Sequence, residues 1–154
     1  MRVWPRFFLA FLALGFGCIR GASACVESAA VYPDLSAVFI STTAGLPADY
    51  VPTDLVELGN KVETNGPVCL KTEAASNLLK MFEAARADGV KLAVAAAYKK
   101  PAGGQPSENQ LGTAVDLTDA SINYALFDQD FSNSRGGRGM RRNAHKYGFI
   151  ISHP

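Results

Sequence analysis

The sequence predicts an α+β domain in which a helix packs on a small sheet. Apolar residues fall at helical spacing between Thr72 and Gly89, and the apolar period then changes to two over residues 90–96. A second alternating stretch, at residues 113–118, predicts another strand. An apolar helix stripe followed by alternating strands gives one buried layer shared by helix and sheet.

The composition is that of one ordinary globular domain. The chain has 154 residues, of which 48% are hydrophobic and 19% charged, and no segment repeats another. Its 15 basic and 14 acidic residues give a net charge of +1. This balance provides no basic field that would hold phosphates, so we expect no nucleic-acid partner.

Residues 1–24 have the pattern of a secretory signal peptide. Two arginines precede the apolar run 7–17, and Ala22-Ser23-Ala24 is a small-x-small cleavage site. The alternative is a membrane anchor, but the apolar run is shorter than the roughly 20 residues that span a bilayer. We therefore expect an exported domain of residues 25–154, periplasmic or extracellular, with no transmembrane segment. Its 12 basic and 14 acidic residues give a net charge of −2.

Export also bears on the cysteines, because Cys18 leaves with the signal and only Cys25 and Cys69 remain. A disulfide between them would tether the N-terminus to the start of the helix and stabilise the fold by about 4 kcal/mol. The alternative is a lipid anchor at Cys25 as the new N-terminal residue. A bacterial lipoprotein site usually has Leu three residues earlier, where this chain has Ala22.

The elements follow in order. Residues 25–65 are turn-rich and extended, and we expect them to wrap around the rest. Thr72 is the expected N-cap of the helix, and Gly89 is its C-terminal stop. The first strand is expected at residues 90–96, and residues 100–106, with two Pro and two Gly, form a loop.

On the second strand, residues 113–118, Ala114 and Asp116 share one face. A carboxylate is a poor strand former, so Asp116 either faces water at a sheet edge or has a specific partner. Further along, four arginines stand among three glycines at residues 135–142, which is typical of a solvated basic loop and hints weakly at anionic polymers or lipid surfaces. A short helix-like stretch follows. The apolar run 147–151 is typical of a strand that continues into a hairpin, but here the sequence stops at Pro154.

Five short motifs follow one another in a fixed order over about 100 residues. They are Tyr50–Val56, Met81–Leu92, Ala96–Lys100, Ser107–Asp116 and Asn143–Phe149. Together they resemble the VanY-like zinc D-alanyl-D-alanine carboxypeptidases, which trim peptidoglycan stem peptides and share a fold with the hedgehog signalling domain. Ala-Ala-Tyr-Lys-Lys stands where that family has Ser-Gly-Tyr-Arg-Ser, and Ser-Glu-Asn-Gln-Leu-Gly-Thr-Ala-Val-Asp stands on its Ser-x-His-x-x-Gly-x-Ala-x-Asp signature. The resemblance implies a small antiparallel sheet with packed helices.

The resemblance also implies a chemistry. In the family the signature His and Asp, with a second His from a late strand, hold zinc, and the zinc-bound water is the nucleophile. A late Glu takes the proton, and the Arg is thought to grip the substrate carboxylate. The late Glu and His would lie beyond Pro154, so we expect an incomplete core domain with its C-terminal strands and general base missing.

Position by position, the family's site is only partly kept. Asp116 is the retained metal-ligand position, but Asn109 replaces the signature His, and an amide oxygen is a much weaker zinc ligand than imidazole. Lys99 replaces the Arg, which keeps a positive charge without the bidentate fork. Lys99 and Ser107 are the expected substrate-binding residues. Zinc binding by this chain is therefore doubtful.

The two histidines offer a partial substitute. We expect His145 on a helix surface and His153 solvated near the chain end. The alternative is a site in which both join Asp116.

Three functions remain open. The first is an active exported zinc peptidase acting on peptidoglycan stem peptides. The second is a non-catalytic module that keeps the family's cleft and binds those peptides. The third is a truncated, non-functional gene product. We expect a cell-wall peptidase-family protein impaired in catalysis, with a peptidoglycan stem peptide as its partner; the sequence does not set its oligomeric state.

Overall fold

The computed structural model describes residue 25 and residues 46–101, 106–125 and 129–152. In these ranges the strands and α-helices are β1 (Leu55–Glu57), β2 (Glu63–Thr64), β3 (Cys69–Lys71), α1 (Thr72–Ala87), β4 (Leu92–Ala96), β5 (Asp116–Asp119) and α2 (Arg135–Asn143). Short 3₁₀ helices join them: η1 (Gly59–Lys61), η2 (Glu108–Leu111), η3 (Ala120–Ile122), η4 (Gln129–Asn133) and η5 (Ala144–Tyr147). No helix in the described ranges combines the length and the apolar character needed to span a bilayer.

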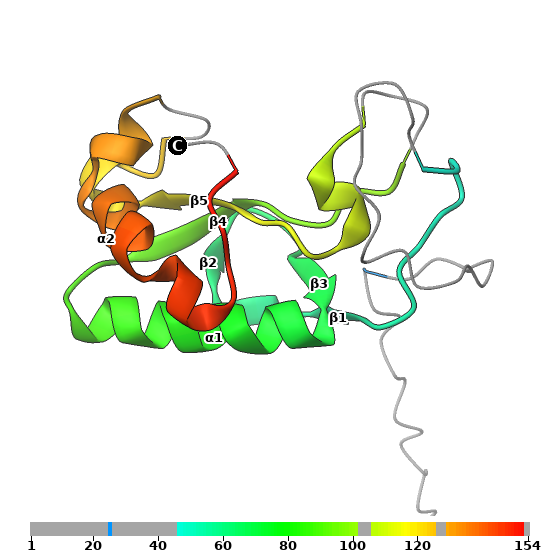
Figure 1. Cartoon of the computed structure of the whole chain (residues 1–154), viewed down its shortest axis with the longest axis horizontal. Coiled ribbons are helices and arrows are strands. Elements are labelled where there is room, and N and C mark those ends of the chain that lie inside the picture. The colour runs from blue at the N-terminus through cyan, green and yellow to red at the C-terminus, as the bar shows by residue number, and fades with distance from the viewer. Residues whose placement is uncertain (1–24, 26–45, 102–105, 126–128, 153–154) are drawn as a thin grey trace, which may run out of the picture.

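Two small sheets make up the β structure (Figure 1). In the first, the strand order is β2-β4-β5; β4 and β5 are antiparallel, and β2 runs parallel to β4. In the second, β1 pairs antiparallel with β3. The α+β class is confirmed. The parallel β2–β4 pairing differs from the antiparallel expectation, and it is possible because α1 lies between the two strands in the chain and serves as the crossover.

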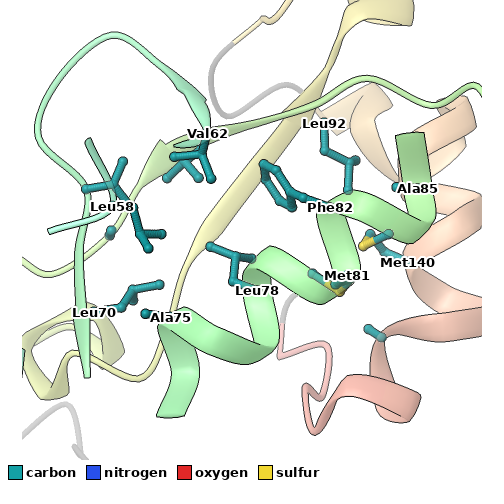
Figure 2. Close-up of a cluster of buried hydrophobic side chains, with 14 residues drawn as sticks. Leu58, Val62, Leu70, Ala75, Leu78, Met81, Phe82, Ala85, Leu92 and Met140 are labelled. Carbon is teal, nitrogen blue, oxygen red and sulfur yellow. The ribbon is translucent and has the colours of Figure 1, made fainter. Parts of the chain in front are cut away.

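Helix α1 carries the core. Its buried positions recur every three or four residues and face the sheets. They are Ala75, Leu78, Met81, Phe82 and Ala85. In Figure 2 these side chains meet Leu70 of β3 and Leu92 of β4, and Met140 of α2 closes the cluster. Each large side chain buried here contributes roughly 1.5–3 kcal/mol to folding.

The ends of α1 agree with the expected helix to within one residue. Gly89 adopts a φ of +70°, and the helix stops before it, as predicted. Thr72, however, is the first helical residue and not the N-cap, which is Lys71. The Thr72 hydroxyl donates a hydrogen bond of 3.0 Å to the carbonyl of Asp54 instead of accepting from its own helix. This bond fastens the helix start to the segment before β1.

Three expectations about the second half of the chain were wrong. The second strand begins at Asp116 and not at Thr113, because Gly112 turns the chain with a φ of +71° and the β4–β5 ladder is irregular between Val94 and Ala96. Residues 135–142 are not a loop but form α2. The apolar run 147–151 forms no strand in the described residues. A hydrogen bond from the Phe149 N–H to the carbonyl of Ala144 ties the start of this run to η5.

Cys25 and Cys69 form a disulfide, with their Cα atoms 5.7 Å apart. The bond ties Cys25 to the first residue of β3, directly before α1, as the disulfide interpretation predicted. A paired sulfur cannot also accept a lipid, so the structure favours the disulfide over the lipid anchor. The expected signal peptide, residues 1–24, lies outside the described residues.

A buried carboxylate at the end of β5 anchors α2. Asp119 is 1% exposed and accepts hydrogen bonds from the backbone and hydroxyl of Ser121, from the Ser134 hydroxyl at 2.6 Å and from the Gly136 N–H at 2.5 Å. Ser134 also caps the helix by accepting from the Gly137 N–H at 2.9 Å. Burial pushes the pKa of Asp119 up, but these hydrogen bonds outweigh it and hold the pKa below its ordinary value.

The contact between Asp119 and Gly136 predicts opposite effects for two glycines of one helix. A Cβ at Gly136 would lie 2.9 Å from Asp119 Cβ and Cγ, whereas a Cβ at Gly139 meets nothing within 4 Å. We expect Gly136→Ala to lower the free energy of unfolding by about 2 kcal/mol through overpacking. We expect Gly139→Ala to raise it by roughly 1 kcal/mol through helix propensity. Urea denaturation of both variants measures the difference, and equal effects would contradict this packing.

The lowered pKa of Asp119 predicts a loss of stability in acid. Because the folded state holds this carboxylate at a lower pKa than the unfolded chain, its contribution is complete above the unfolded value of about 3.9. The contribution is lost as the pH falls through the folded pKa. Urea unfolding at a series of pH values from 6 to 2 should show this loss, and Asp119→Asn should flatten it. An equal acid slope in both proteins would show that Asp119 is not the group responsible.

Candidate functional site

The candidate site lies where β4 ends and β5 begins. Ala96, the last residue of β4, is paired with Asp116, the first residue of β5. Between the two strands the chain passes through residues 98–99 and η2, which lie at the opposite end of the molecule from α2 (Figure 1). The antiparallel pairing therefore brings the Tyr98-Lys99 segment, η2 and Asp116 to the same end of the sheet.

Asn109 and Asp116 are in direct contact. Asn109 is 5% exposed, and its side-chain Nδ2 donates a hydrogen bond of 3.0 Å to Asp116 Oδ2. Asp116 begins β5, which is an edge strand of the three-stranded sheet, and it is half-buried with Asn109 as a side-chain partner. A hydrogen bond to an ionised acceptor is roughly twice as strong as a neutral one.

Ser107 and Lys99 both form hydrogen bonds with the backbone of Asn109. The Ser107 hydroxyl caps η2 by accepting from the Asn109 N–H at 3.3 Å. The Lys99 N–H donates to the Asn109 carbonyl at 3.4 Å, and the Lys99 side chain is exposed. The two expected substrate-binding residues thus flank the Asn109–Asp116 pair. Ser107 has, in addition, a positioning role that its place in the motif did not reveal.

Two tyrosines connect this site to the disulfide. The Tyr98 N–H donates to the carbonyl of Cys69 at 3.1 Å, and the Tyr98 hydroxyl donates to the carbonyl of Tyr50 at 3.2 Å. Burial, with a smaller effect from the neighbouring Tyr50, raises the pKa of Tyr98, so its phenol stays protonated at neutral pH. Sequence reasoning placed Tyr98 in the motif but did not find this contact, whose partner is 48 residues away.

Gly112 fixes the turn that leads from η2 to β5. Its φ is +71°, and a Cβ at this position would lie 2.8 Å from a Leu55 methyl carbon and 3.3 Å from Pro52. Its carbonyl accepts from the Lys71 N–H at 2.8 Å. The segment around Pro52 and Leu55 therefore packs directly on the turn that positions Asn109 and Asp116.

Sequence comparison connects this arrangement to a known family. The family model described as VanY, D-alanyl-D-alanine carboxypeptidase, matches residues 99–154, which include Asn109 and Asp116. A protein named "Putative carboxypeptidase YodJ" of Bacillus subtilis (strain 168) is 28% identical over 151 residues, covering 79% of this chain and 54% of the relative. The chain thus spans about half the length of this curated relative.

Solved structures agree with the sequence match. The LdcB LD-carboxypeptidase, from a study of peptidoglycan recognition, has a TM-score of 0.65 at 28% identity, over 75% of this chain and 65% of LdcB. The chain is therefore similar to the VanY-like carboxypeptidases, in sequence over residues 99–154 and in fold over most of its described residues. A vancomycin-resistance D,D-pentapeptidase VanY in complex with Zn(II) has the same fold, with a TM-score of 0.56 at 23% identity and 77% coverage of each chain.

The described residues do not fit the zinc of that VanY structure. Of the Asn109–Asp116 pair, only Asp116 is a strong zinc ligand, and the Asn109 amide directs an N–H, not an oxygen, toward the carboxylate. Within the described ranges no three His, Cys, Asp or Glu side chains are grouped to hold a metal ion. His145 is exposed on η5, which packs on α1 and α2, as the surface interpretation predicted. His153 lies outside the described residues.

The hydrogen bond from Asn109 to Asp116 predicts how a carboxylate at position 109 would change the stability of the fold. Asn109→Asp would place two carboxylates against each other, so the pKa of one of them rises. Each unit of that rise costs about 1.4 kcal/mol of folding stability above the raised pKa. We therefore expect the variant to be less stable at pH 7 than at pH 4, relative to the natural chain. Asn109→Ala, which adds no charge, should show no such pH dependence; equal behaviour of the two variants in urea unfolding would contradict the contact.

Proposed function

We propose that this chain is an exported cell-wall protein that binds peptidoglycan stem peptides at the Asn109–Asp116 end of the sheet and is impaired in zinc-dependent hydrolysis. The hydrogen bond from Asn109 Nδ2 to Asp116 Oδ2 carries the proposal. In this bond Asp116, the metal-ligand position retained from the VanY-like signature, accepts from the Asn109 amide. LdcB matches 75% of this chain with a TM-score of 0.65, and a similar fold beside altered ligands is the pattern of a binding module.

The charges and hydroxyls at this end suit a peptide with a free carboxyl terminus. Lys99 is exposed beside Asn109 and supplies a cation where the family has an Arg. Its ammonium is a point charge, which attracts a carboxylate without fixing its orientation. The half-buried Ser107 lies on the other side of Asn109 and offers a hydroxyl. LdcB is described by its recognition of peptidoglycan, and a VanYB structure holds D-alanine-D-alanine, which supports the same peptide class.

The disulfide supports export. Disulfides persist in oxidising compartments and are rare in the cytosol, and Cys25–Cys69 is the pair that remains when residues 1–24 are removed as a signal peptide. A periplasmic or extracellular place also gives access to peptidoglycan.

Binding and hydrolysis are separated by one set of measurements on the same peptide. A stem pentapeptide ending in D-Ala-D-Ala is titrated by calorimetry, with zinc and again with EDTA, and free D-Ala is assayed in the zinc sample. We expect saturable binding under both conditions and no release of D-Ala. A peptide ending in L-Ala-L-Ala is the matched ligand control.

Two variants locate the binding. Lys99→Gln should weaken binding about fivefold, the equivalent of roughly 1 kcal/mol for a partly exposed charge pair. Lys80→Gln removes an exposed cation from α1, away from the site, and should leave binding unchanged. Release of D-Ala by the natural chain, lost in Asp116→Ala, would show that the protein is an active carboxypeptidase and not a binding module. Absence of any binding would overturn the proposal.

A further inference from the structure

A cavity of about 340 Å³ opens at the other end of the three-stranded sheet. It is lined by Leu92, the first residue of β4, whereas the Asn109–Asp116 site begins at Ala96, the last residue of that strand. Four residues of extended strand place the two sites roughly 13 Å apart along β4. The cavity is therefore separate from the site proposed to hold the stem peptide.

The floor of the cavity is apolar. It consists of Val62 between η1 and β2, Phe82 of α1 and Leu92 of β4, all of which are buried. Figure 2 shows these three side chains at the edge of the core cluster, where α1 faces the sheet. A ligand seated here would rest an apolar group on the outer side of the core.

The rim is basic. Lys61, Arg86 and Lys91 line it together with one acidic residue, Glu63, so the charged side chains sum to +2. Lys61, Arg86 and Lys91 are exposed, and in the part of the chain that the structure describes none of them forms an ion pair. Three cations around an apolar floor favour a ligand that carries negative charge.

One wall of the cavity comes from a turn with an unfavourable backbone conformation. Asn123 and Tyr124 have φ values of 53° and 56°, in the left-handed region that a Tyr rarely adopts. Hydrogen bonds hold this turn, from the Asn123 N–H to the carbonyl of Ala120 and from the Tyr124 N–H to the carbonyl of Asp119 at 3.0 Å. A glycine would fit this backbone without strain. The residue present is instead a tyrosine that lines the cavity.

We propose that this cavity binds a small organic anion, with an apolar or aromatic body against Phe82 and Tyr124 and a carboxylate or phosphate group among the three cations. Its volume is at the lower end of the range of small-molecule pockets, about 300–1,000 Å³. A carboxylate and a phosphate ester share the required chemistry, so the ligand class is a monoanionic or dianionic group on an apolar body.

The test is a titration of the full-length ¹⁵N-labelled chain, followed by amide NMR shifts, with three probes of similar size. Phenyl phosphate and N-benzoylglycine carry the two anionic groups, and N-benzoylglycinamide is the neutral control. We expect saturable shifts at residues 60–63 and around Arg86 and Tyr124 with at least one anionic probe, and weaker binding of the amide. Preference for phenyl phosphate identifies a phosphate ester as the ligand class, and preference for N-benzoylglycine identifies a carboxylate.

Three variants complete the test. Arg86→Gln should weaken anion binding about fivefold, and Lys80→Gln, on the same helix but outside the cavity, should not change it. Tyr124→Gly should weaken binding while the melting temperature stays the same or rises, because the strain is relieved; a purely structural tyrosine would lower both. Equal binding of all three probes, no shifts at the cavity, or an unchanged affinity in Arg86→Gln would overturn the proposal.

Discussion

The rest of the structure depends on one buried carboxylate, that of Asp119 at the end of β5. It accepts hydrogen bonds from Ser121 of η3 and from Ser134 and Gly136 at the start of α2. An ionised group with so little contact with water is stable only because these donors replace its hydration. The network fixes the end of β5 against η3 and the start of α2. With the far end of β5 held, Asp116 is set at the opposite end of the same strand, beside η2.

The two carboxylates of β5 thus have different environments and different consequences. Asp119 accepts its hydrogen bonds from η3 and the start of α2, so its role is to hold these segments together. Asp116 accepts a hydrogen bond from Asn109 and lies half-buried at the end of the sheet that we propose to bind the stem peptide. Hydrogen bonds and close packing of η2, Gly112 and the Tyr98-Lys99 segment define this end of the sheet. We propose that Asn109 supplies an amide where the VanY-like signature has an imidazole, a difference that changes the chemistry of the site more than its shape.

The sequence was sufficient where the signal was local. Helix α1 and strand β4 follow from apolar spacing, and the family resemblance assigned Lys99, Ser107, Asn109 and Asp116 to one site. Local patterns failed for α2, whose glycines and arginines have the composition of a loop. Its helical form depends on Asp119, 17 residues before Gly136, and on the close approach that only a glycine permits there. The parallel β2 strand escaped prediction because two residues give no period, and the Tyr98–Tyr50 contact because its partners are far apart in the chain.

We propose that Asn109 prevents metal binding at this site while the site itself remains formed. The most direct test is the zinc content of the purified chain and of Asn109→His, measured by elemental analysis after equilibration with a slight excess of zinc and desalting. We expect no retained zinc in the natural chain and increased retention in Asn109→His, lost again when Asp116→Ala is added. Near one zinc per natural chain, lost in Asp116→Ala, would contradict it.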